Sequence, residues 1–408
     1  MSADTNPEMQ KVDEELIPVR SAHGDEIMMN EKLFERIKSV YERRDQLGLD
    51  PLQLRLTEKV YKGFERSGAN LSKEDKEELK KINADLSLAS MRFGNNLLAE
   101  NARYRLVLED NEVSGLPSGI RTAARNAAKD AGLGSSKYLF NLSRPSIFPF
   151  ITYSDRREYR QEIYTGYLEK CNHKDSLDNN VNINDIVRLR TRRAPLLGFG
   201  SHSEYVLDNV MAKTPANVYS LLDELWTPAL NRAKQELEDM KDIRRRESGM
   251  DDFNSWDWWY YSEKVRKEKY NLDQETLRPY FALPNVRDGI FELSNRLYGI
   301  MFRPAPAPLY NEECFVYEVL DDDGSHLGIL YLDYQPRPGK RSGAWCGSYR
   351  GKSYDGEGNR IAPVVTIVCN FTRPTSTSTP ALLSLDEVET LFHEFGHALH
   401  SLFSDVPY

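Results

Sequence analysis

The chain has 408 residues, of which 40% are hydrophobic and 11% aromatic, and its formal net charge is −9. This apolar content supports a large buried core and excludes a disordered or fibrous protein. The negative balance, without a concentrated basic face, argues against nucleic acid as a partner. No stretch approaches the roughly 18 consecutive apolar residues of a membrane span, and the first residues show no signal-peptide pattern. We therefore expect a cytoplasmic protein without a membrane partner.

Helix-spaced apolar residues dominate the sequence up to about residue 312. The pattern from Asn30 to Glu109 predicts two or three consecutive long helices, and Ser72 is the expected N-cap of the third because acidic residues follow it. Further helices are expected over about 120–132, 155–170, 182–197 and 215–246. Neither a repeat nor a low-complexity linker separates these segments, so we expect one large helical domain.

The sequence pattern changes at about residue 313. The runs Cys314–Leu320 and Leu327–Asp333 are short and partly alternating, and Asp321–Ser325 between them has turn composition, which predicts a hairpin. Arg341–Cys346 and Pro363–Phe371 are expected to add two strands. We therefore predict a mainly α fold with a small antiparallel sheet directly before the last helix. An edge of this sheet offers a place for an extended peptide to lie.

Local signals specify the last helix. Ser384 and Glu387 have the spacing of a capping box, and the apolar residues that follow recur at helical intervals. The helix is expected to run from Leu385 to Phe403, before Pro407.

His393, Glu394 and His397 form an H-E-x-x-H motif on this helix. Histidines four residues apart project from one face, near enough to share one zinc ion at ~2.0–2.1 Å per nitrogen. Glu394 is poorly placed as a third ligand but well placed as a general base, which takes a proton from a zinc-activated water and passes it to the leaving amine. The motif therefore predicts a zinc metallopeptidase with His393 and His397 as metal ligands and Glu394 as the catalytic base.

The alternative is that the two histidines are core residues bonded to carbonyl groups. Gly396 argues against it, because glycine inside a helix costs about 1 kcal/mol relative to alanine and indicates a close backbone approach. We therefore prefer the zinc interpretation.

A catalytic zinc site of this type needs a third protein ligand. His400 lies about 10 Å from His393 along the helix axis, too far for one ion to bridge. Asp405 lies beyond the expected end of the helix. The third zinc ligand is therefore not identified in this chain: it is absent, supplied by a partner, or drawn from an upstream acidic residue.

The sequence resembles the thimet-oligopeptidase-like zinc metallopeptidases, and within them the bacterial peptidyl-dipeptidase, or dipeptidyl carboxypeptidase, branch. Matching motifs occur in family order over most of the chain. They are Leu196–Phe199, Met211–Pro215, Trp256–Tyr261, Glu263–Arg266, Leu277–Tyr280, Gly339–Trp345, Asn370–Thr372 and Thr390–His400.

The resemblance implies a large multi-helical, two-lobed metallopeptidase fold with a deep channel that admits short peptides. Residues 1–312 would form the predominantly helical channel wall, and residues 313–408 would hold the small sheet and the zinc-binding helix. The peptidyl-dipeptidase branch releases C-terminal dipeptides, and the alternative is the oligopeptidase branch, which cuts internal bonds. By the same resemblance, Gly343 and Ala344 would bond to the substrate backbone, and Zn²⁺ would be the cofactor.

The sequence also departs from the family. There the third ligand is a glutamate roughly two dozen residues after the second histidine, and this sequence ends before that position. We expect an internal or N-terminal-to-middle portion of a longer enzyme, with the catalytic subdomain incomplete at its C-terminus. The 408-residue chain is then either inactive alone or a peptide-binding half that needs a complementing C-terminal segment.

Two further clusters have open interpretations. Arg337, Lys340 and Arg341 are expected either to meet a substrate carboxylate or to lie in a solvated loop. The aromatic residues within Trp256–Tyr261 are expected either to line a channel or to form core at a helix start.

Overall fold

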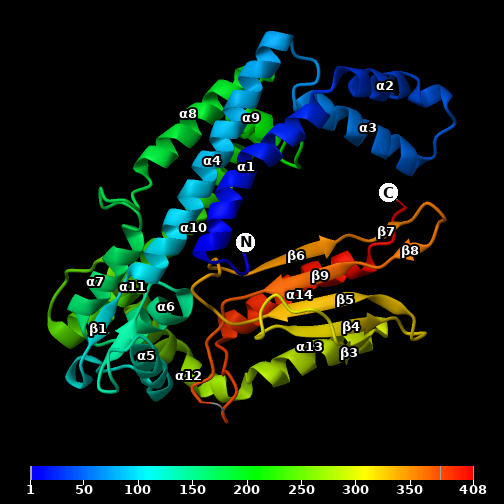
Figure 1. Ribbon diagram of the computed structural model, residues 1–408. Coiled ribbons are helices and arrows are strands. Elements are labelled where there is room, and N and C mark those ends of the chain that lie inside the picture. Colours follow the sequence, from blue (N-terminus) through cyan, green and yellow to red (C-terminus); the bar gives the residue numbers. More distant parts are fainter. Residues whose placement is uncertain (1, 377, 408) are drawn as a thin grey trace. The chain divides into compact units, whose positions relative to one another are not determined.

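The computed structural model describes residues 2–376 and 378–407 (Figure 1). The chain divides into two compact units. Unit 1 comprises residues 2–5, 101–170 and 236–407, and unit 2 comprises residues 6–100 and 171–235. This division differs from the single helical domain that the sequence predicts. The reason is that the chain passes between the units inside two continuous helices, α4 (Lys73–Arg103) and α10 (Pro215–Ser248), so no linker composition marks those boundaries.

Unit 2 is built of helices, and most of them follow the predicted segments. They are α1 (Pro7–Met28), α2 (Glu31–Glu42), α3 (Pro51–Arg66), α8 (Asn180–Leu196), α9 (His202–Leu207) and the adjoining parts of α4 and α10. Ser72 caps α4 as predicted, since its hydroxyl accepts a hydrogen bond from the N–H of Asp75 at 3.1 Å. The sequence pattern does not predict α1, and none of the residues of this helix is buried.

The helical part of unit 1 packs around its own apolar core. Its elements are β1 (Leu106–Leu108), α5 (Ser118–Asp130), β2 (Tyr138–Phe140), α6 (Arg144–Tyr153), α7 (Arg157–Leu168), α11 (Trp258–Tyr270) and α12 (Gln274–Leu277). Phe150 of α6 and Ile163 of α7 are both buried in this core. Asp257 is fully buried and accepts hydrogen bonds from Arg157 and Arg160, which joins the start of α11 to α7.

The rest of unit 1 holds a five-stranded sheet in the order β3-β4-β5-β9-β6 (Figure 1). The strands are β3 (Met301–Pro304), β4 (Phe315–Leu320), β5 (His326–Asp333), β6 (Trp345–Arg350) and β9 (Val364–Val368), and β7 (Ser353–Tyr354) pairs with β8 (Arg360–Ile361) as a separate two-stranded sheet. β4 and β5 form the predicted hairpin.

The pairing of β5 with β9 is parallel, so the sheet is mixed rather than antiparallel as predicted. Parallel neighbours need a long connection, and here the connection runs through β6, which forms the edge of the sheet. β3 lies before residue 313, so the sheet itself begins earlier than the predicted boundary. The division into a channel wall and a zinc-binding region stays a prediction.

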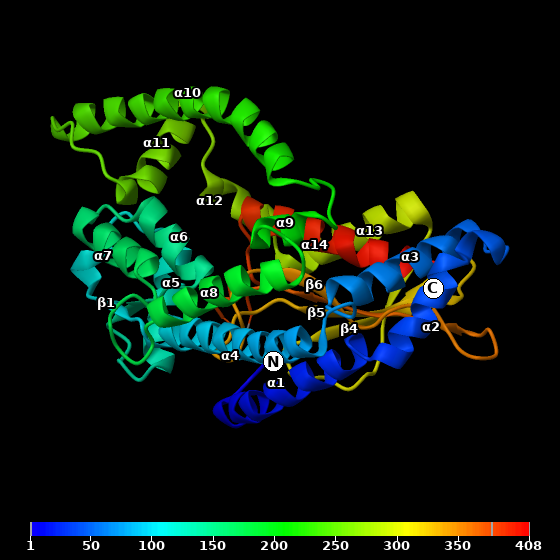
Figure 2. The same ribbon diagram turned by 90° about the horizontal axis from the view of Figure 1, so that it is seen from above.

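Two helices, α13 (Leu283–Tyr298) and α14 (Leu385–Phe403), cover the same face of the sheet (Figure 2). Ile290 of α13 and Phe395 of α14 lie in one core with Val365 of β9. The bounds of α14 are those that the sequence predicts. Among the helices of the described ranges, none combines the length and the apolar character needed to cross a membrane.

Candidate metal centre

Glu387 fastens the first turn of α14 to the loop that follows β9. The predicted capping box is present: the Ser384 hydroxyl accepts a hydrogen bond from the N–H of Glu387 at 3.2 Å, and Glu387 Oε2 accepts one from the N–H of Ser384 at 2.8 Å. Glu387 Oε1 also accepts from the N–H and the hydroxyl of Thr372, at 2.7 and 2.9 Å. These bonds define where the helix begins and therefore which face each later residue occupies.

His393 and His397 lie on the face of α14 that points away from the sheet. Their Nε2 atoms are 3.2 Å apart and both residues are exposed, whereas Leu391 and Ala398 are buried. The histidines are therefore not core residues. Two imidazoles bound to one tetrahedral zinc ion have nitrogens about 3.3 Å apart, so the observed separation fits two ligands of such an ion. A Cβ added at Gly396 would meet no described atom within 4 Å, so the expected backbone approach is not observed in this part of the chain.

Glu394 lies between the histidine face and the sheet and is only 8% exposed. The thiol of Cys346 on β6 has its pKa raised to about 11, by burial and then by the negative charge of Glu394. The structure therefore places this carboxylate near the sheet edge. None of the described residues donates a hydrogen bond to it or forms an ion pair with it, so the carboxylate is available to accept a proton.

The described residues contain no cluster of three or more His, Cys, Asp or Glu side chains that could hold a metal ion. His400 is exposed on the same helix but further along it. The Asp405 carboxylate is 2.5 Å from Nζ of Lys352 and accepts a hydrogen bond from the hydroxyl of Tyr354 at 3.0 Å. This acid is therefore engaged elsewhere and is not a third ligand beside His393.

Gly343 and Ala344 directly precede β6, the edge strand of the sheet. Gly343 has a φ of +98°, a left-handed conformation that favours glycine. The side-chain amide of Asn370, which follows β9, donates hydrogen bonds to the carbonyl oxygens of Gly343 at 2.7 Å and Arg341 at 2.9 Å. β6 pairs with β9 alone among the strands described, so its outer side has no strand partner there.

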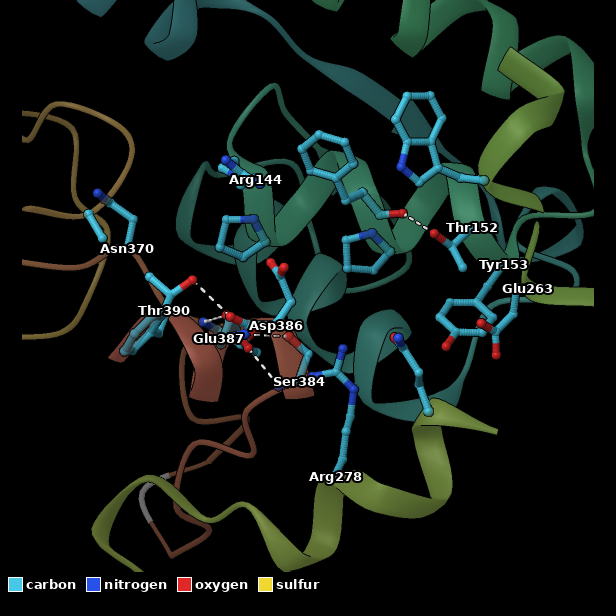
Figure 3. A pocket seen from close by; sticks show the side chains of 18 of the residues that line it. Arg144, Thr152, Tyr153, Glu263, Arg278, Asn370, Ser384, Asp386, Glu387 and Thr390 are labelled. Carbon is cyan, nitrogen blue, oxygen red and sulfur yellow. Dashed lines mark hydrogen bonds between the residues drawn. The ribbon is translucent and has the colours of Figure 1, made fainter. Parts of the chain in front are cut away.

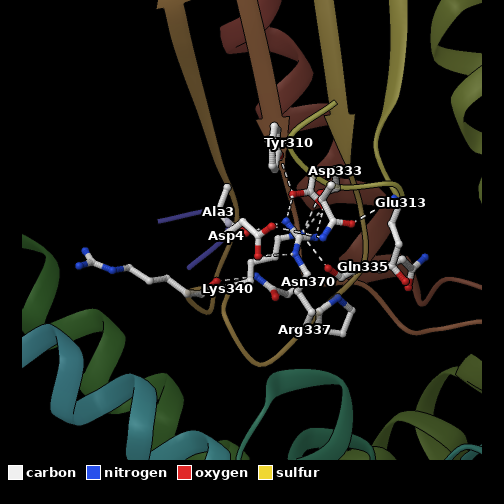
Figure 4. A network of polar contacts seen from close by, with 12 residues as sticks. Ala3, Asp4, Tyr310, Glu313, Asp333, Gln335, Arg337, Lys340 and Asn370 are labelled. Atoms are coloured by element: carbon white, nitrogen blue, oxygen red, sulfur yellow. Dashed lines mark hydrogen bonds and ion pairs between the residues drawn. The ribbon is translucent and has the colours of Figure 1, made fainter. Parts of the chain in front are cut away.

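Asp333, the last residue of β5, is the centre of a buried ion network (Figure 4). Its carboxylate lies 2.8 Å from Nζ of Lys340 and 2.8 Å from the guanidinium of Arg337, and it accepts a hydrogen bond from the Tyr310 hydroxyl at 2.6 Å. Burial by itself raises the pKa of Asp333, but these three donors outweigh it and hold the pKa below its usual range. Arg337 and Lys340 therefore neither meet a substrate carboxylate nor lie in a solvated loop, and both sequence-based interpretations are wrong for them. Arg341, in contrast, is exposed.

A cavity of about 320 Å³ opens beside the first turns of α14 (Figure 3). Its walls come from α6, α11, α14 and the Gly343–Ala344 segment, and α14 contributes Asp386, Glu387 and Thr390. Thr390 and Asp386 share the helix face of His393 and lie about 4.5 and 10.5 Å before it along the axis. The cavity therefore continues the histidine face toward the start of α14.

The aromatic cluster is divided between the core and the wall of this cavity, and a role in a substrate channel stays a prediction. Tyr261 is buried, whereas Trp259 lines the cavity, with its ring centre 5.6 Å from that of Phe148 on α6. The sequence pattern does not indicate Arg144 or Phe148 as site residues. No motif marks them, because α6 reaches the cavity only by packing against α11.

Residues 150–408 match peptidase family M3. The chain is 34% identical over 406 residues to the dipeptidyl carboxypeptidase of Escherichia coli K12, and the aligned region covers 99% of this chain and 59% of the relative. It is 31% identical over 411 residues to oligopeptidase A of the same strain, and the alignment covers 99% of this chain and 60% of that relative. It is 32% identical over 411 residues to organellar oligopeptidase A of Arabidopsis thaliana, with 97% of this chain and 52% of that relative covered. The chain thus spans between 52% and 60% of the length of these relatives.

Proposed function

The chain belongs to peptidase family M3, and we propose that it provides the zinc-binding region of a metallopeptidase that acts on short peptides. The observation that carries this proposal is the pair of exposed imidazoles on α14, whose Nε2 atoms are 3.2 Å apart and which lie within the matched residues. The names of the relatives, a dipeptidyl carboxypeptidase and two oligopeptidases, support the same class of reaction.

His393 and His397 would hold the zinc ion through their Nε2 atoms. A bound zinc ion supplies a Lewis acid, which polarises a carbonyl group and lowers the pKa of water. Glu394 acts as the general base: its carboxylate accepts the proton of the attacking water and delivers it to the amine nitrogen when the peptide C–N bond breaks. The position of Glu394 beside the histidines, without a charged partner among the described residues, supports this role.

We propose that the third zinc ligand comes from a complementing segment outside the described residues. Two imidazoles leave two positions of a tetrahedral ion open, and a catalytic site fills one of them with protein. The relatives are longer than this chain, which covers 59% of the E. coli dipeptidyl carboxypeptidase.

The substrate would lie as an extended strand beside the sheet edge, with Gly343 and Ala344 bonding to its backbone. Asn370 holds the carbonyl of Gly343 in place for this contact. We propose release of C-terminal dipeptides, on the identity of 34% to the dipeptidyl carboxypeptidase. Cleavage of internal bonds is the second candidate, favoured by the identity of 31% to oligopeptidase A. A peptide with an amidated C-terminus separates the two, because an enzyme anchored on a free carboxylate would cut it far more slowly.

Zinc binding by the chain tests the proposal directly. We expect the chain to take up zinc in equilibrium dialysis, and we expect His393→Ala to weaken that uptake strongly. His400→Ala is the matched control, because it removes an exposed histidine from the same helix without touching the pair. Equal zinc uptake by the unaltered chain and by His393→Ala would contradict the proposal.

A further inference from the structure

A second cavity, of about 1020 Å³, lies within unit 2, and its walls come from α3, from the segment after α8 and from the segment after α9. Five basic and three acidic side chains line it, an excess of two positive charges, although the whole chain carries −9. The bases are Arg55, Lys59, Lys62, Arg66 and Lys213, and the acids are Glu58, Glu65 and Asp208. A hollow in which one sign of charge is concentrated attracts ligands of the opposite sign.

The bases of α3 form a single stripe along that helix. They recur at intervals of four, three and four residues, at Arg55, Lys59, Lys62 and Arg66. These intervals keep them on one face over about 16.5 Å of helix axis. Side chains of like charge three or four residues apart destabilise a helix unless a counter-ion neutralises them. The stripe therefore favours a bound anion.

The two arginines of the stripe have partners within the protein. Arg55 lies 3.4 Å from the carboxylate of Glu58. Arg66 pairs with Asp208 at 2.5 Å and donates a hydrogen bond to the carbonyl oxygen of Tyr205. These guanidinium groups therefore fix the walls of the cavity and are not the groups left for a ligand.

Three lysine ammonium groups at this cavity have no counter-ion among the described residues. Lys59, Lys62 and Lys213 are exposed, and none of them forms a hydrogen bond or an ion pair with a described residue. The third acid of the wall, Glu65, accepts a hydrogen bond from the side-chain amide of Asn70 at 3.4 Å instead. Lys213 belongs to the segment after α9 and not to α3. Two separate segments of the chain thus bring unneutralised ammonium groups to one cavity.

The chemistry of these groups points to phosphate. An ammonium group is a compact charge with three rotatable donors, and it binds phosphate oxygens without the fixed geometry of a guanidinium. A chain of phosphate groups supplies several negative charges on one small molecule, as three neighbouring lysines require. A cavity of about 1020 Å³ is at the upper end of the volumes that hold small molecules. Glu58 and Glu65 flank the basic stripe, which disfavours a long nucleic-acid strand along it.

We propose that the cavity of unit 2 binds a small molecule that carries a chain of two or more phosphate groups, held by Lys59, Lys62 and Lys213. Inorganic polyphosphate and a nucleoside triphosphate both provide this chemistry. The site is independent of the proposed zinc site, because His393 and His397 belong to unit 1. Either proposal can therefore fail without the other.

The test titrates tripolyphosphate into the chain without added metal, at low ionic strength, and measures binding by calorimetry. We expect saturable binding that the double variant Lys59→Gln/Lys62→Gln weakens by roughly tenfold or more, and that Lys213→Gln weakens by roughly three- to tenfold. Orthophosphate should bind at least roughly tenfold more weakly, because a single group reaches fewer ammonium groups. Lys11→Gln/Lys81→Gln is the matched control, since it removes the same charge from exposed positions that do not line the cavity.

Lack of saturable tripolyphosphate binding would overturn the inference. Equal losses in the two double variants would also overturn it, because they would show attraction to net charge and not to a site. Unchanged binding in Lys213→Gln would exclude the cavity and leave only the face of α3. Urea denaturation should show that Lys59→Gln/Lys62→Gln is at least as stable as the unaltered chain, since it removes like charges from α3, so that lost binding cannot be attributed to unfolding.

ATP separates the two sources of a phosphate chain. Phe199 lines the cavity and offers an aromatic ring to a base. Binding of ATP that is tighter than that of tripolyphosphate, and that loses this gain in Phe199→Ala, would identify a nucleotide as the ligand. Equal or weaker binding of ATP would identify the inorganic chain.

Discussion

Lys340 and Asp333 form an ion pair of 2.8 Å in which both side chains are fully buried. Nζ of Lys340 also donates to the carbonyl oxygens of Asp333 and Gln335, at 3.1 and 2.7 Å, so the donors of this ammonium are satisfied. The pair ties the end of β5 to the loop that leads to Gly343 and Ala344. Changes at this pair should therefore affect both the fold and the sheet edge.

We expect Asp333→Asn to lower the free energy of unfolding by about 3–5 kcal/mol, because it leaves the buried ammonium of Lys340 without a counter-ion and removes one of the two carboxylate partners of Arg337. Urea denaturation at neutral pH measures this loss. Asp322→Asn, at an exposed position in the turn between β4 and β5, should change stability by about 0.5 kcal/mol or less. A loss at Asp333 no larger than that of the control would show that the network contributes little.

The same carboxylate makes part of the stability dependent on pH. The pKa of Asp333 is lower in the folded protein than the value of about 3.9 expected for an unfolded chain. Its contribution should therefore be fully present above that unfolded value and be lost as the pH falls through the lowered folded pKa. The stability difference between the unaltered chain and Asp333→Asn should be constant above about pH 5 and shrink below about pH 4. A difference that stays constant down to pH 2 would contradict this assignment.

Glu394→Gln should remove nearly all peptide hydrolysis from any preparation of the chain that shows it, by roughly 10² to 10⁴-fold, while zinc binding persists. The amide keeps the size of the side chain but cannot accept the proton. Initial rates with a short peptide and zinc content by atomic emission measure the two effects separately. Glu389→Gln, at an exposed position of the same helix, should leave both unchanged. Full activity in Glu394→Gln would exclude Glu394 as the base.

The Cys346 thiol reports the position of the Glu394 charge without any turnover. Burial and the nearby carboxylate raise the pKa of Cys346 to about 11, so the thiol is protonated near neutral pH and should react slowly with iodoacetamide. Glu394→Gln removes the negative charge and should lower this pKa, which speeds alkylation at a fixed pH in the absence of added zinc. Mass spectrometry of the Cys346 peptide follows the reaction. Identical rates in the two proteins would mean that the carboxylate lies too far from the thiol to act on it.

Local sequence signals are sufficient wherever neighbouring residues make the structure. The bounds of α14 follow from Ser384, Glu387 and an apolar stripe, and the hairpin of β4 and β5 follows from two apolar runs around an acidic turn. The spacing of His393 and His397 by itself places both imidazoles on one face, because the helical repeat sets that geometry. Their roles as zinc ligands, and that of Glu394 as the base, stay predictions.

Long-range packing produces what the sequence pattern does not reveal. Asp333, Arg337 and Lys340 lie close together in the sequence, but their burial is not apparent from it. That burial depends on distant residues, since Tyr310 donates to Asp333 and Asp4 pairs with Arg337. The parallel pairing of β5 with β9 is likewise not predicted, because register between distant strands depends on the path of the whole connection.

The amino-acid order is enough to identify the H-E-x-x-H helix and its capping box and to predict the class of chemistry, because these depend on residues within a few positions of one another. Arg144 of α6 and Asp386 of α14 are 242 positions apart in the sequence, and the sequence alone cannot show that they line one cavity. That arrangement arises when apolar faces of separate elements bury one another, and the free energy of such burial depends on surfaces that no single segment contains.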